Sequence, residues 1–216
     1  MTKLAPALNW PRLQRVLLCG AMLATLSGCV EMMVGSAVVG TVAASDRRTF
    51  GAQAEDRTIE VKGEVRLPGI VGKDGHVNVN SFNRKVLLSG EVRDDAMKAT
   101  VEREVAGIDG VQSVANELEV TFLSSFTSRS NDTLITGKIK ASLVDMKDIS
   151  AYSFKVVTER GTVFLMGRVT RREGRIAGEI ASGVSGVRKV VKLFDYIADD
   201  DGKPAQAASP PAAAAY

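Results

Sequence analysis

The sequence has few of the residues that carry most enzyme chemistry. Among its 216 residues are one histidine, two cysteines and one tryptophan, and aromatic residues make up 5%. A single histidine, His76, completes neither a His-based catalytic triad nor a metal pair; it follows the turn at 72–75, and we expect a surface turn residue. Glycine-rich phosphate loops and base-stacking aromatics are also missing. We therefore expect no enzyme activity, catalytic residues, metal, cofactor or nucleic-acid partner.

The first 29 residues have the pattern of a secreted, lipid-modified protein. Three basic residues precede an apolar run over 16–26, which closes with Leu-Ser-Gly-Cys at 26–29 and resembles a bacterial lipobox. An ordinary signal peptide and a membrane-spanning helix are the alternatives, but a span needs about 20 apolar residues. We predict that 1–28 is a signal peptide that is removed, and that Cys29 carries the acyl chains, palmitate among them. Val30 follows instead of Asp, which indicates an outer-membrane anchor facing the periplasm.

The segments that flank the centre of the chain have biased compositions. Residues 30–44 are rich in Val, Gly, Ala and Ser, and we expect 29–54 to be a lipidated N-terminus followed by a tether; a membrane-dipping segment is the alternative. Residues 198–216 are rich in Ala and Pro and predict a disordered tail, because they cannot bury enough apolar surface to fold. Cys19 lies in the predicted signal peptide, so no disulfide forms in the mature chain.

Between these segments the sequence repeats itself. Residues 85–92 (KVLLSGEV) match 162–169 (TVFLMGRV), and 105–111 match 180–187 after one gap. The period of about 76 residues exceeds the roughly 20 to 50 of solenoid repeats, so each copy should be a small domain with its own core. Domains this small are marginal alone, and we expect the two to pack on each other.

Both copies predict the order helix, strand, strand, helix, strand. In the second copy Asn131, Asp132 and Thr133 offer caps for a helix that ends near Asp145. Further elements are predicted at 152–158, 162–169, 171–182 and 187–197, and those of the first copy at 56–67, 77–81, 85–92, 95–106 and 111–122. Gly63 and Pro68 predict that the first helix is short or irregular. The predicted fold class is α+β, with domains at 55–122 and 131–197, a linker at 123–130, and helices packed on a three-stranded sheet in each domain.

These residues resemble a known family. The sequences GTVFLMGRV at 161–169 and ASGVSGV at 181–187, behind a lipobox, are similar to dual BON-domain lipoproteins of the outer membrane, and NDTLIT at 131–136 is similar to their division-associated type. The resemblance covers about residues 46–197. It implies a non-enzymatic protein that binds anionic phospholipid, concentrates at division sites and supports outer-membrane integrity.

The resemblance also implies which element faces the lipid. In such proteins it is the first helix of the second domain, which corresponds to 134–143 here. Leu134 stands where that type carries an aromatic residue, and leucine lacks the ring that favours the headgroup level. Membrane affinity should therefore be weaker or depend more on charge.

Net charge is divided unequally between the copies. Residues 55–122 have 9 basic and 13 acidic residues, whereas 131–192 have 12 and 6. A basic residue near an anionic leaflet contributes on the order of 1 kcal/mol; a merely solvated face, or pairing with the acidic first domain, is the alternative. The candidate phospholipid-binding residues are Leu134, Ile135, Lys138, Lys140, Arg171 and Arg172.

A second function remains open. The same surface, or exposed strand edges, would also serve a periplasmic adaptor that docks a protein partner of envelope assembly or cell-wall remodelling. The sequence leaves the oligomeric state, the lipid species and that partner open.

Overall fold

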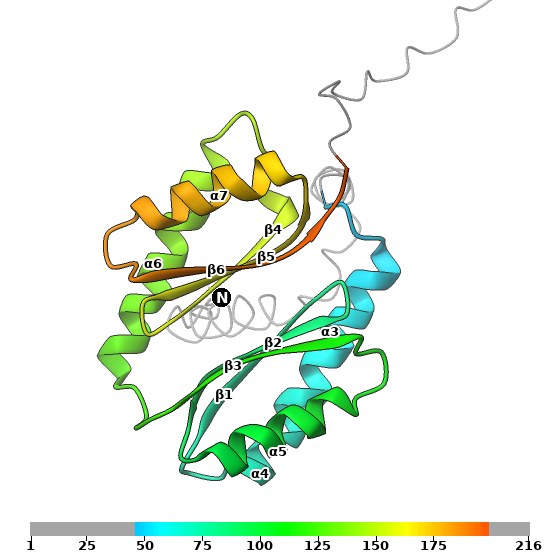
Figure 1. The fold of residues 1–216 in the computed structure, drawn as a ribbon, viewed down its shortest axis with the longest axis vertical. Coiled ribbons are helices and arrows are strands. Elements are labelled where there is room, and N and C mark those ends of the chain that lie inside the picture. The colour runs from blue at the N-terminus through cyan, green and yellow to red at the C-terminus, as the bar shows by residue number, and fades with distance from the viewer. Residues whose placement is uncertain (1–45, 199–216) are drawn as a thin grey trace, which may run out of the picture. The chain divides into compact units, whose positions relative to one another are not determined.

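Each repeat folds into a three-stranded sheet with helices on one face, in a computed structural model that describes residues 46–198 (Figure 1). The first contains α3 (Phe50–Arg66), α4 (Pro68–Val71), β1 (His76–Phe82), β2 (Lys85–Val92), α5 (Asp95–Ala106) and β3 (Ser113–Val120). The second contains α6 (Phe126–Val144), the 3-10 turn η2 (Ala151–Ser153), β4 (Phe154–Glu159), β5 (Thr162–Val169), α7 (Arg171–Gly183) and β6 (Lys189–Tyr196). The predicted fold class and element order are confirmed. The predicted signal peptide, Cys29 and nearly all of the predicted tail lie outside the described residues.

The two sheets have the same topology. Their strand orders are β1-β2-β3 and β4-β5-β6, with an antiparallel hairpin followed by a parallel pair. A parallel pair needs a crossover, which α5 and α7 provide. No helix within residues 46–198 is long and apolar enough to cross a membrane.

The central strands bury side chains on both faces. On β2, Val86 and Leu88 pack among the helices of the first domain, while Leu87 points the other way. On β5, Val163 and Leu165 likewise pack among the helices of the second domain. A third apolar cluster lies between the sheets and draws on both domains: Phe82, Leu87, Phe164 and Met166. The prediction that the domains pack on each other is therefore confirmed.

The first helix of each domain differs from its prediction. Helix α3 has 17 residues and is regular, because Gly63 gives room to β1: a Cβ there would lie 2.9 Å from Val79 Cγ2. Pro68 opens α4, where its missing N–H costs nothing. Helix α6 begins at Phe126, with the Ser125 hydroxyl accepting from the Ser128 N–H at 3.2 Å. Five of the eight residues of the predicted linker 123–130 are thus helical.

The capping role predicted for Asn131, Asp132 and Thr133 is wrong, because all three lie inside α6. Asp132 instead holds the β4–β5 turn: its carboxylate accepts from the N–H groups of Arg160 at 2.9 Å and Gly161 at 2.8 Å. Both turn residues have positive φ, which aims successive N–H groups at one acceptor. Asp56, 76 residues earlier, makes the same two bonds to the β1–β2 turn, at 2.7 Å each.

Candidate functional site

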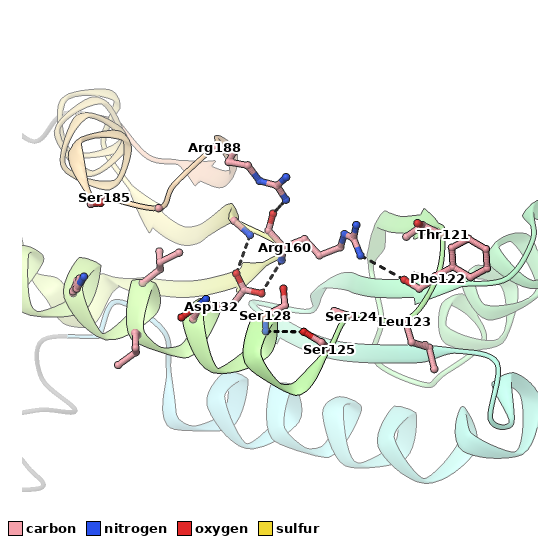
Figure 2. Close-up of a pocket in the computed structure, with 16 residues that line it drawn as sticks. Thr121, Phe122, Leu123, Ser124, Ser125, Ser128, Asp132, Arg160, Ser185 and Arg188 are labelled. Carbon is pink, nitrogen blue, oxygen red and sulfur yellow. Dashed lines mark hydrogen bonds between the residues drawn. The ribbon is translucent and has the colours of Figure 1, made fainter.

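A groove of about 670 Å³ lies beside the first half of α6 (Figure 2). The segment from β3 to α6 forms one end, and the β4–β5 turn and the α7–β6 loop form the opposite wall. Asp132 also lines it, and its carboxylate accepts hydrogen bonds from the turn N–H groups of Arg160 and Gly161. Its apolar and cationic lining includes Phe122, Leu123, Leu134, Lys138, Arg160 and Arg188.

The groove is bordered by exposed apolar side chains. Leu134 is 62% exposed and Phe122 is 94% exposed. Phe126, the first residue of α6, is 80% exposed close to the same end. A partner that covered these side chains would remove large apolar surfaces from water.

Three cationic side chains line the same groove. Arg160 is held in place, with Nε 3.1 Å from Glu119 Oε2 and a bond to the Phe122 carbonyl at 3.5 Å. Arg188 donates to the Arg160 carbonyl, as Figure 2 shows. Lys138 is exposed and makes no ion pair with any residue in 46–198. The groove therefore joins apolar and cationic groups at one edge of the second domain.

The six candidate lipid-binding residues do not form one site. Leu134 and Lys138 do line the groove together. Ile135 also lines the groove, but it is only 7% exposed and belongs to the core of the second domain, so it offers little surface to a ligand. Lys140 lines a different hollow, with Tyr152 among its neighbours.

Arg171 and Arg172 begin α7, away from the groove. Arg172 lies 3.6 Å from Asp148, and Arg171 lies over the Tyr196 ring at 5.2 Å. Sequence reasoning missed Arg188, Phe122 and Phe126. In the sequence, Arg188 is a basic residue after a turn, Phe122 lies at a predicted strand end and Phe126 lies in the predicted linker. Only the fold brings the three beside α6.

A second group of polar side chains lies between the two sheets. His76, Glu91 and Glu159 each offer a ligand atom, all within 4.8 Å of one another. His76 Nδ1 is 3.5 Å from Glu91 Oε2. The Ser124 hydroxyl bonds Glu91 Oε1, and Asn78 Nδ2 donates to Glu159 Oε2 at 2.9 Å.

The environment of this cluster disfavours two negative charges. Burial first, and then the negative charges of Glu91 and Asp132, raise the pKa of Glu159 to about 7, against the opposing hydrogen bond from Asn78. Glu91 itself is fully buried. The expectation for His76 is wrong: it is the first residue of β1, half-buried beside Glu91.

The other end of the interface joins opposite charges. Lys155 of β4 bonds Glu60 of α3, and Lys85 Nζ lies 2.5 Å from Asp195 Oδ1. Burial alone would raise the pKa of Glu60, but hydrogen bonds from Lys155 and the Ser81 N–H outweigh it and hold the pKa below its usual value. Part of the basic charge of the second domain, at Lys155, thus pairs with an acidic residue of the first domain. Such pairing was the predicted alternative to lipid binding for these charges.

Comparison with known proteins identifies the fold. The BON domain family matches residues 60–121 and 131–198. The chain therefore belongs to the BON-domain family and has two copies of the domain, as the sequence predicted. It is 38% identical over 174 residues to "Outer membrane lipoprotein DolP" of Haemophilus influenzae, covering 80% of this chain and 90% of that protein.

Other relatives and solved structures are more distant. The chain is 31% identical to the "21 kDa hemolysin" of Actinobacillus pleuropneumoniae, over 70% of this chain and 79% of that one. It is also 31% identical to "Osmotically-inducible protein Y" of Escherichia coli, over 55% and 60%. The C-terminal domain of CdsD, a structural protein of the Chlamydia trachomatis type III secretion system, aligns with a TM-score of 0.28 and 11% identity, over 61% of this chain and 96% of that one. That likeness is too weak to inform the function.

Proposed function

We propose that this protein is a non-enzymatic lipoprotein of the outer membrane that binds anionic phospholipid through its second BON domain and supports membrane integrity at division sites. The observation that carries the proposal is the groove, where exposed Leu134 and Phe122 lie beside Lys138 and Arg188. Apolar side chains enter the acyl region while lysine and arginine attract anionic headgroups. The relative named as an outer membrane lipoprotein supports the location.

The lipid anchor belongs to the same proposal. Acylated Cys29 would hold one end of the chain at the periplasmic face, and tethering raises the effective concentration of the groove at that surface. A Cys29→Ser chain should leave the membrane fraction, as measured by cell fractionation.

Vesicle co-sedimentation tests the groove directly, using the unit Ser45–Tyr216, which contains both domain cores. We expect binding to phosphatidylglycerol vesicles, little binding to phosphatidylcholine vesicles, and weakening with salt. Leu134→Asp should abolish binding, because a charge replaces the exposed leucine.

Val144→Asp is the matched control. Val144 ends the same helix and is 64% exposed, against 62% for Leu134, but does not line the groove. Equal loss in both variants would overturn the groove as the lipid site. Absence of binding to any vesicle would favour the protein-docking adaptor instead.

A further inference from the structure

The cluster between the sheets unites three ligating side chains from two domains. His76 and Glu91 face each other across the β1–β2 pair, and Glu159 ends β4 of the second domain. His76 is the one histidine of the chain. Imidazole nitrogen and carboxylate oxygen are both ordinary ligands of zinc-class ions.

Buried polar atoms at this point lack partners. Within residues 46–198, neither Glu91 Oε2 nor His76 Nδ1 has a hydrogen-bond partner, although Glu91 is fully buried. Ser89 Oγ, two residues before Glu91 on β2, is in the same condition. Buried polar groups nearly always have a partner, so atoms converging without one indicate a missing ligand.

The charges also favour a cation. Glu91 and Glu159 converge in a buried place, and Asp132 adds a third carboxylate nearby. The nearest cation of known geometry is Arg160, with Nη1 3.7 Å from Glu91 Oε1, but its Nε pairs with Glu119.

The distances between the three ligand atoms fit a small ion if the side chains move slightly closer together. Ligand atoms about 2.1 Å from a tetrahedral ion lie roughly 3.4 Å apart, and His76 Nδ1 to Glu91 Oε2 measures 3.5 Å. No two of the three ligand atoms are more than 4.8 Å apart. The separations therefore need to shorten by at most about 1.4 Å to reach that geometry.

The surroundings have the remaining parts of a metal site. Ser124 donates a hydrogen bond to one oxygen of Glu91, and Asn78 donates one to an oxygen of Glu159. These bonds orient the two carboxylates. A hollow of about 370 Å³, lined by His76 and Glu159, gives an ion a path from solvent. Calcium and magnesium prefer sites made only of oxygen, so the imidazole favours a transition metal.

We propose that His76, Glu91 and Glu159 bind one divalent transition-metal ion of the zinc class, which links the two BON domains. Since the ligands come from both domains, bound metal stabilises the packed arrangement over the unfolded chain. None of the three ligands lines the groove, so different variants test the metal site and the lipid site.

Zn²⁺ titration of the full chain, purified in detergent without a histidine tag, tests the site. The measurements are competition with a chromophoric chelator, thermal unfolding, and the NMR signal of the single imidazole. We expect a site with one equivalent of Zn²⁺, a saturating rise in Tm, and a shift of the imidazole signal; Mg²⁺ should produce none of these.

His76→Ala and Glu159→Gln should each weaken binding at this site at least about tenfold. Asp74→Asn is the matched control: it removes an exposed acid, with 66% side-chain exposure, two residues before His76 and outside the cluster. The cysteines are the same in every variant, so any thiol-bound Zn²⁺ cancels in the comparison. Circular dichroism of the metal-free variants verifies folding.

Two results from the variants would overturn the site. One is unchanged Zn²⁺ affinity in His76→Ala, which would mean that the ion binds elsewhere. The other is equal weakening in Asp74→Asn, which would mean that surface charge alone attracts the ion. Absence of any saturable binding or imidazole shift in the native chain has the same consequence.

Discussion

The two BON domains share their topology and their turn contacts but differ in the side chains around them. Asp56 and Asp132 hold equivalent turns, and the glycines at 110 and 186 both have φ near +97°. Beside those turns, Thr58 and Gln112 of the first domain occupy the positions that Leu134 and Arg188 occupy in the second, 76 residues later. The hydrogen bonds from the helical aspartate to the turn are the same in both copies, whereas the residues at the positions that line the groove differ.

Removing the helical aspartates should have the largest effect. Asp132→Ala leaves two turn N–H groups without an acceptor, and we expect a loss of about 2–4 kcal/mol in the free energy of unfolding. Asp56→Ala should lose about 3–5 kcal/mol, because it also removes the ion pair with Arg48 at 2.8 Å and the acceptor of the Ser81 hydroxyl at 2.7 Å. Urea titration measures both. A loss below about 1 kcal/mol in either would show that the turns do not depend on the clamp.

Glu159→Gln should change how stability depends on pH. Glu159 occupies the strand end that Phe82 occupies in the first domain. Because its folded pKa of about 7 lies above the usual 4.5, the native protein loses stability as pH rises from 4.5 through 7, by at most about 3 kcal/mol. The glutamine variant keeps an acceptor for Asn78 and should lack this decrease.

The measurement is urea titration at pH 5 and pH 8 in the presence of a metal chelator. The free energy of unfolding of the variant, relative to that of the native protein, should be higher at pH 8 than at pH 5. Parallel changes in both proteins would mean that Glu159 does not titrate in this range.

Lys155→Met should have a smaller effect at the opposite end of the interface. Glu60 has a lowered pKa, so the native pair contributes stability above pH 4.5 that is lost as pH falls through the folded pKa. Since the Lys155 side chain is 28% exposed, we expect a loss of only about 1–2 kcal/mol at pH 7. The difference from the native protein should shrink at pH 3.5 in the same urea assay; a constant difference would point to packing instead.

Exchanging the groove residues for those of the first domain should have the smallest effect. Leu134→Thr should remove about 1 kcal/mol of apolar transfer free energy. This corresponds to roughly a fivefold loss in affinity for phosphatidylglycerol vesicles. Arg188→Gln should lose a similar amount at low salt and less at high salt. The reverse exchange Thr58→Leu is the control, and it should leave vesicle affinity unchanged unless the first domain also touches the membrane.

The sequence predicted most of the fold because its signals are local. The strands at 85–92 and 162–169 and the helix at 95–106 have the predicted bounds, since alternation and helical spacing are written in consecutive residues. The start of α6 was misplaced because Asp132, a good capping residue, instead binds a turn 28 residues away. Nothing in the adjacent sequence distinguishes the two roles.

The sequence by itself determined that there are two BON domains, their element order and the unequal charge, because each depends on composition, periodicity or an internal match. Only the tertiary structure decided which side chains meet. It buries Ile135, separates Arg171 from Leu134, and brings His76 to two carboxylates from strands far apart in the chain. Such contacts follow from how two sheets pack face to face, and no spacing along a single strand or helix encodes that.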